Sequence, residues 1–147
     1  MGYSSTIKTK VRIGTTKPAA ALADYEADTY TPIAGLTDIG EFGDEFEEIK
    51  FNTIEDGRTH KLKGSADAGN WDVEVARNPN DPGQIALRAA AKSSDGVFNF
   101  HVELADGTDF YFRGNVMAGK NSFGSNDVNK QKFTVGITSE ILEVAAA

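Results

Sequence analysis

Several short runs of this chain alternate between apolar and polar residues. In residues 6–13, TIKTKVRI, the apolar side chains fall at every second position, and similar runs return at 70–77, 97–104, 108–118 and 131–137. A period of two places alternate side chains on opposite faces of an extended strand. A chain that repeats this pattern must bury one face of a sheet, so the sequence predicts a mainly β fold.

Two Asp-Gly pairs lie between neighbouring strand-like runs. Asp56-Gly57 separates 44–54 from 58–64, and Asp106-Gly107 separates the two runs that follow. Glycine accepts the positive φ angles of tight hairpin turns. We therefore expect antiparallel strands joined by hairpins at both places.

One segment carries a helical signal. Asp81 is a natural N-cap, Pro82 suits the first helical position, and an alanine-rich stretch ends near Lys92. The sequence predicts a helix over about 82–93. The expected fold is α+β and mainly β: an antiparallel β-sandwich or barrel with one short flanking helix.

The stretch GEFGDEFEEIKF, residues 40–51, is ambiguous by itself. Phe42, Phe46 and Ile49 fall at helical spacing, whereas Ile49 and Phe51 fall at strand spacing. This pattern is compatible with three structures: an amphipathic helix, a catalytic or metal-binding carboxylate cluster, and a charged strand. The turn at Asp56-Gly57 and the returning strand favour the first arm of a hairpin, with a bulge at Glu47-Glu48. Its carboxylates then form an electrostatic surface, made of Glu41, Asp44, Glu45, Glu47 and Glu48.

Charge is unevenly distributed along the chain. Its net value is −7, which disfavours ordinary nucleic-acid binding. Residues 1–20 carry cations and no acid, whereas residues 21–49 carry acids and no cation. Two interpretations remain open: a solvated surface, or a basic segment of one copy that meets the acidic segment of another.

No catalytic centre is visible in the sequence. Cysteine is absent, and the two histidines, His60 and His101, lie on different predicted hairpins without a metal-binding spacing. We expect no metal, no cofactor and no enzymatic activity. Three interpretations remain at this point: a self-assembling structural protein, a ligand- or carbohydrate-binding β-sandwich module and a small β-barrel enzyme.

Two segments are poor in core residues. Residues 52–70 contain only Ile54 and Leu62 as large apolar side chains, and we expect a long polar hairpin loop that projects from the domain. Residues 1–32 are expected to form an N-terminal strand and arm, which closes over the domain or over a neighbouring copy.

An ordered series of weak motifs resembles a known family. The series is Asp56-Gly57, Lys63-Gly64, Trp71, the stretch NPNDPGQ at 78–84, Phe112-Arg113-Gly114 and Phe133. Over roughly residues 33–140 it resembles the major tail tube protein of long-tailed, siphovirus-type bacteriophages.

The resemblance implies a single tail-tube domain over 1–147, with a fold shared with the ring protein of type VI secretion. It implies hexameric rings that stack into a hollow tube in the virion tail, assembled in the host cytoplasm. The implied partners are further copies of the chain and the tape measure, tail terminator and distal tail proteins. DNA is expected to pass through without specific binding, and no membrane is involved.

The resemblance also suggests which residues meet other subunits. The arm and the hairpin loop are expected to contact adjacent rings, and the carboxylates of 41–48 to face the lumen or a neighbour's basic strand. The inter-subunit candidates are Lys8, Lys10, Arg12, Ile54, Glu55, Asp56, Gly57, Arg58, His60, Lys61 and Lys63.

Overall fold

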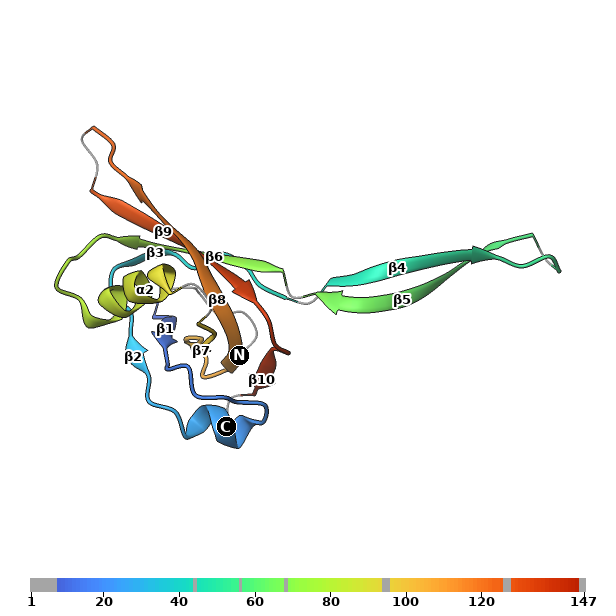
Figure 1. Cartoon of the computed structure of the whole chain (residues 1–147), viewed down its shortest axis with the longest axis horizontal. Helices are drawn as coiled ribbons and strands as arrows, with labels where there is room; N and C mark the ends of the chain where they lie inside the picture. The colour runs from blue at the N-terminus through green and yellow to red at the C-terminus, as the bar shows by residue number, and fades with distance from the viewer. Residues whose placement is uncertain are drawn as a thin grey trace.

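A computed structural model of the 147-residue chain shows a curled sheet, a helix against one of its faces and a long hairpin that projects sideways (Figure 1). It describes residues 8–43, 45–55, 57–67, 69–93, 96–125 and 128–145, apart from the side chains of Glu47, Ser65 and Ala118. In chain order the elements are β1 (Lys10–Ile13), α1 (Leu22–Glu26), β2 (Thr31–Pro32), β3 (Leu36–Asp38), β4 (Glu45–Asn52), β5 (Thr59–Asp67), β6 (Asn70–Ala76), α2 (Pro82–Lys92), β7 (Phe98–Glu103), β8 (Asp109–Ser122), β9 (Lys130–Ile137) and β10 (Leu142–Val144).

Eight of these strands form one antiparallel sheet in the order β2-β1-β7-β8-β9-β6-β3, with β10 paired to β8. The long strand β8 pairs with β7 over Asp109–Gly114 and with β9 over Gly114–Ser122. Between Val116 and Ala118 it advances two residues while β9 advances one, so β8 carries a bulge there. The predicted mainly β, antiparallel fold is confirmed.

The core lies on one face of the curled sheet. Trp71, Phe100, Phe112 and Phe133 are completely buried, and the rings of Trp71 and Phe112 meet edge to face with centroids 5.3 Å apart. These side chains occupy the apolar positions of the alternating runs, which confirms that interpretation.

Helix α2 covers this face and confirms the predicted helix to within one residue. The carboxylate of Asp81 accepts a hydrogen bond from the backbone N–H of Gln84 at 3.0 Å, which is the expected N-cap. Leu87 and Ala90 are buried beneath the helix. Gly83 lies so close to the backbone of β2 that a Cβ there would collide with Pro32, so the helix can settle directly on the strand.

The opposite face of the sheet is partly covered as well, by the arm. Tyr25 of α1 is 1% exposed, and its ring packs at 5.6 Å from that of Tyr111 on β8. Asp28 accepts hydrogen bonds from the Thr15 hydroxyl at 2.6 Å and the Asn99 amide at 2.7 Å. The described residues of the arm therefore pack on their own domain.

Both predicted turns contain a glycine with positive φ, at 65° for Gly57 and 97° for Gly107. Asp56 lies outside the described residues. The hairpin predicted from 44–54 and 58–64 is present as β4 and β5. The segment 52–70 is largely strand, because β5 occupies Thr59–Asp67 and pairs along β4. Its alternating residues satisfy their backbone hydrogen bonds in a ladder, although few of them pack on a core.

Several short elements were not predicted, among them α1 and β10. Helix α1 covers only Leu22–Glu26, and β10 lies at Leu142–Val144. Both are too short to produce a recognisable period, and both depend on contacts with β8.

Candidate assembly surface

The β4–β5 hairpin (Glu45–Asp67, with Asp56 outside the described residues) extends away from the sheet as a separate two-stranded ribbon (Figure 1). Ile49 pairs with Leu62, and Phe51 pairs with His60, so these four side chains share one face. The Phe51 and His60 rings stack with centroids 5.2 Å apart. Ile49 remains 48% exposed, Phe51 43% and Leu62 57%, which leaves an apolar face without cover in the single chain.

The other face of the hairpin is charged. Glu48 pairs with Lys63 in the ladder and lies 3.5 Å from the Lys61 ammonium, while Lys63 lies over the Phe46 ring at 4.8 Å. Lys50 pairs with Lys61 on the same face. Exposed ion pairs of this kind stabilise a fold weakly, so they do little to anchor the hairpin.

A bulge occurs where the sequence predicted one, but the extra residue belongs to the other strand. From Phe46 to Glu48, β4 advances two residues while β5 advances three, from Ala66 to Lys63. The prediction placed the bulge on β4 at Glu47-Glu48, and it was wrong about which strand carries the extra residue. Because β4 keeps its alternation, Phe46 lies on the charged face with Glu48, and Ile49 lies on the apolar face.

The predicted acidic surface lies at the base of the hairpin. Glu41 and Glu45 are exposed, and Glu45 pairs in the ladder with Asp67, which places two acidic residues opposite each other. Asp44 lies outside the described residues, as does the side chain of Glu47. Within the described ranges no three histidine or carboxylate side chains cluster closely enough to hold a metal ion.

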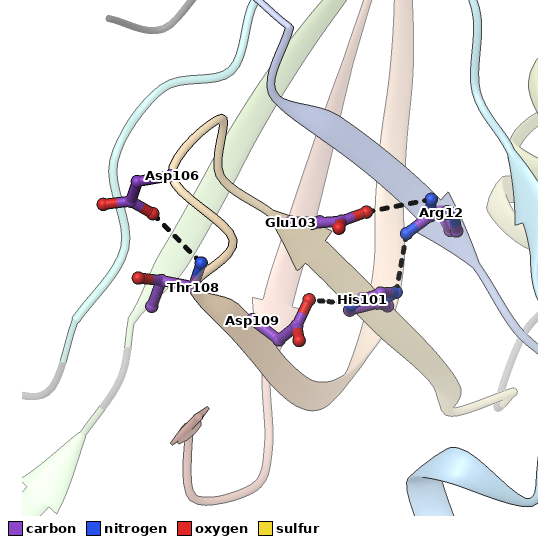
Figure 2. Close-up of polar contacts among 6 residues, drawn as sticks. All are labelled: Arg12, His101, Glu103, Asp106, Thr108 and Asp109. Atoms are coloured by element: carbon purple, nitrogen blue, oxygen red, sulfur yellow. Dashed lines mark hydrogen bonds and ion pairs between the residues drawn. The ribbon is translucent and has the colours of Figure 1, made fainter. Parts of the chain in front are cut away.

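The basic candidates of the N-terminal strand lie apart from the hairpin. Lys8 and Lys10 are exposed, but Arg12 is engaged inside the domain (Figure 2). Its guanidinium donates to His101 Nδ1 at 3.0 Å and to Glu103 Oε1 at 3.1 Å. The charge of Arg12 is thus already compensated by Glu103 in its own chain.

The same hydrogen bonds determine which ring nitrogen of His101 carries the proton. A guanidinium only donates hydrogen bonds, so His101 Nδ1 must accept, and Nε2 then carries the proton that it donates to Asp109 Oδ1 at 2.8 Å. The ring also stacks on Tyr111 at 4.5 Å. These contacts link β1, β7 and β8 and give His101 a structural role in this arrangement.

The structure adds a second exposed apolar surface that the sequence reasoning missed. Among the described residues, the large exposed apolar side chains divide into a set on the hairpin and a set near α2 and the β8–β9 turn. The hairpin set is Phe46, Ile49, Phe51, Ile54 and Leu62; the other set is Ile85, Met117, Phe123 and Val128. Met117 is the extra residue of the β8 bulge, and its side chain lies on the surface. A bulge interrupts the alternation of side chains, so the sequence pattern did not predict this exposure.

The aromatic residues that a carbohydrate-binding module would need are largely inside. Trp71 is completely buried and donates its indole N–H to the Ile39 carbonyl, and Tyr111 is 8% exposed. Neither ring has a face available to stack on a sugar. No helix in the described part of the chain has the length and apolar character needed to cross a membrane.

Similarity to known structures extends over nearly the whole chain. A chain from the anti-feeding prophage baseplate superposes with a TM-score of 0.74 at 13% identity, covering 98% of this chain and 97% of that one. A chain from the tail of an empty gene transfer agent particle, refined with C6 symmetry, gives 0.73 at 13% identity, covering 97% and 100%. The SPP1 tail tube gives 0.63 at 12% identity, covering 92% and 75%. At these identities the likeness establishes the fold.

The sequence itself identifies the family. A search of curated protein sequences returned no match. The family model described as phage tail tube protein matches residues 13–146, nearly the full length, and this agrees with the fold and with the resemblance found in the motifs. The chain therefore belongs to the phage tail tube protein family.

Proposed function

We propose that this structural subunit assembles into stacked, hexameric rings that form the wall of a hollow tail tube, through which DNA leaves the virion. The observation that carries the proposal is the β4–β5 hairpin, which extends from a well-packed body and presents an uncovered apolar face. Burying that face on another copy would recover roughly 25 cal/mol for each Å² of apolar surface removed from water.

The distribution of exposed apolar residues supports a ring or tube over a two-fold dimer. The hairpin set and the set near α2 are both apolar, but they belong to different elements and lie on different parts of the subunit. Contacts between unlike surfaces repeat from copy to copy and generate closed rings or open stacks. The gene transfer agent tail to which this fold is similar was refined with C6 symmetry, which favours a six-fold ring.

We assign the inter-subunit contacts to the two groups of residues expected from the sequence, with one change. The hairpin candidates Ile54, Glu55, Asp56, Gly57, Arg58, His60, Lys61 and Lys63 and the exposed Lys8 and Lys10 remain candidates. Arg12 is a weaker candidate, because Glu103 already compensates its charge. The acidic group Glu41, Asp44, Glu45, Glu47 and Glu48 faces either the lumen or a neighbouring basic strand.

In this proposal the protein is a non-enzymatic virion component, and its other partners are the proteins that start, measure and close the tail. An acidic wall would repel the phosphates of the passing DNA, since each subunit carries a net charge of −7. Substituting lumen carboxylates with lysine should then slow ejection, and ejection at the original rate would contradict this electrostatic role.

Imaging tests the assembly directly. Purified protein at rising concentration should give rings and hollow tubes of uniform diameter by negative-stain electron microscopy. Analytical ultracentrifugation of the same samples should show the loss of monomer. A monodisperse monomer at every concentration, together with binding on a glycan array, would instead favour the ligand-binding alternative.

A further inference from the structure

A cationic hollow of about 420 Å³ lies between α2 and the outer part of the β8–β9 hairpin. Three of its lining residues are basic, two carry amides and one is an exposed apolar side chain. They are Arg77, Arg88, Lys92, Asn121, Gln131 and Met117. The hollow is unusual in a chain with a net charge of −7, because it collects positive charge at one place.

Among the described residues, no ion pair within 4 Å involves Arg77, Arg88 or Lys92. Arg88 donates to the Gln131 side chain at 3.2 Å and to the Asn78 carbonyl at 3.0 Å, and Arg77 donates to the Asn121 side chain at 3.2 Å. All three acceptors are neutral. Burial and repulsion from the nearby Arg77 lower the pKa of Arg88, and the attraction of the Asp81 carboxylate opposes these effects without outweighing them.

Such a site favours a carboxylate. Arginine binds carboxylates through paired, charge-assisted hydrogen bonds, and arginine is enriched among the residues that dominate protein interfaces. An occupant should also bring an apolar group, because Met117, 54% exposed, lines the hollow. The required chemistry is one acidic residue beside one apolar residue on a protruding segment.

The tip of the β4–β5 hairpin has this chemistry. Ile54 is fully exposed, and Glu55, also exposed, follows it directly. Figure 1 shows the far end of the β4–β5 hairpin on the opposite side of the subunit from α2 and the outer part of β8–β9, the elements that line the hollow, so a chain cannot fill its own hollow. The eight residues of β4 reach about 26 Å at about 3.3 Å per residue, which is enough to carry the tip onto a neighbouring copy.

We propose that the hollow between α2 and β8–β9 receives the hairpin tip of a second copy, with Glu55 paired to Arg77 and Arg88 and Ile54 against Met117. The proposal rests on the self-assembly proposed above and names the surface that receives the hairpin. The contact joins unlike surfaces, so it repeats from copy to copy in one direction.

Disulfide trapping tests the contact. The chain has no cysteine, so no native thiol can form a competing cross-link. The single variants Glu55→Cys and Arg77→Cys are mixed under assembly conditions and oxidised. The expected product is a cross-linked dimer, formed between the two variants and absent from either variant alone. Replacing Arg77→Cys with Lys120→Cys is the matched control, since Lys120 pairs with Lys132 rather than lining the hollow.

Charge exchange provides a second test. Glu55→Lys alone and Arg77→Glu alone should each raise the concentration needed for assembly by about tenfold or more. An equal mixture should assemble near the original concentration, because each tip then meets a hollow of opposite charge. Lys120→Glu should assemble like the parent chain, and thermal melts should confirm that every variant is folded.

The outcomes separate this inference from the proposed function. If the parent chain forms tubes, but the cysteine pair does not cross-link and both charge variants assemble normally, the receiving surface is wrong and the tube function stands. If the parent chain never assembles and no cross-link forms, both proposals fail.

Discussion

The body of this protein and its β4–β5 hairpin use the same kinds of side chain in opposite ways. In the body Phe100, Phe112 and Phe133 are completely buried, whereas in the hairpin Phe51 and Leu62 remain about half exposed. The hairpin forms a separate two-stranded sheet, and an isolated two-stranded ribbon is at best marginally stable in water. The difference indicates that the body supplies most of the folding energy, and it supports the proposal that the hairpin presents its apolar surface for assembly.

The largest expected loss of stability follows from a change in the middle of the body. Trp71→Ala removes a buried ring that contacts Phe100 and Phe112 and leaves the Ile39 carbonyl without its indole donor. We expect the free energy of unfolding to fall by about 3–5 kcal/mol, measured by chemical denaturation. A loss below about 1 kcal/mol would show that the body does not depend on this core.

A smaller loss is expected at the joint between α2 and the sheet. Gln84 is completely buried, and its amide donates to the carbonyls of Ala34 at 2.8 Å and Ala76 at 3.0 Å. Gln84→Leu leaves both carbonyls and the Asn78 N–H unpaired, which should cost about 2–3 kcal/mol in the same assay. The exposed neighbour Ile85→Gln is the control and should change stability by less than about 0.5 kcal/mol.

The attachment of the arm should depend on pH through Asp28. Burial acts to raise the pKa of this carboxyl, but hydrogen bonds from Thr15, Asn99 and Thr29 outweigh it, and the pKa lies below its usual value. The folded state therefore binds the proton less readily than the unfolded state does. The stabilisation is present above about pH 4 and is lost as pH falls through the folded-state pKa.

Denaturation curves at about pH 6 and about pH 3 would measure this effect. Asp28→Asn should lose less stability over that interval than the parent chain, because it lacks the titrating group. An equal loss in both proteins would show that Asp28 does not anchor the arm.

A substitution in the hairpin is expected to have the smallest effect on the stability of the monomer and a large effect on assembly. Leu62→Ser removes an apolar side chain that is 57% exposed in the single chain, so the free energy of unfolding of the monomer should change by less than about 0.5 kcal/mol. The concentration required for tube formation should rise, since the variant offers less apolar surface to a neighbour. Unchanged assembly would remove Leu62 from the interface.

Much of the body was predictable from periodicity. The alternating runs gave β6, β7 and β9 to within one residue at each end, and the cap at Asp81 with Pro82 gave α2. The bulge at Met117 and the pairing of β10 with β8 were not predictable, because they depend on tertiary contacts between distant segments. The receiving hollow was missed for the same reason: Arg77, Arg88 and Asn121 come from three separate parts of the chain.

The candidate surface was predicted less completely than the fold. The polar character of 52–70 marked a segment with few core residues, and the strand predicted at 58–64 lies within a longer strand, β5, that continues to Asp67. The basic face of residues 8–12 suggested a free interface, whereas Arg12 is paired with Glu103 in its own chain. The sequence shows where charged side chains lie along the chain, but only the fold shows which of them are already paired with an opposite charge.

Replacing the hairpin tests most directly whether it serves assembly and not folding. Glu45 and Asp67 are paired directly, so a two-residue Asn-Gly turn can connect the strands in place of the segment between them. The account predicts a chain whose melting temperature stays close to that of the parent monomer and which forms no rings or tubes by electron microscopy. A shortened chain that unfolds, or one that assembles like the parent, would contradict it.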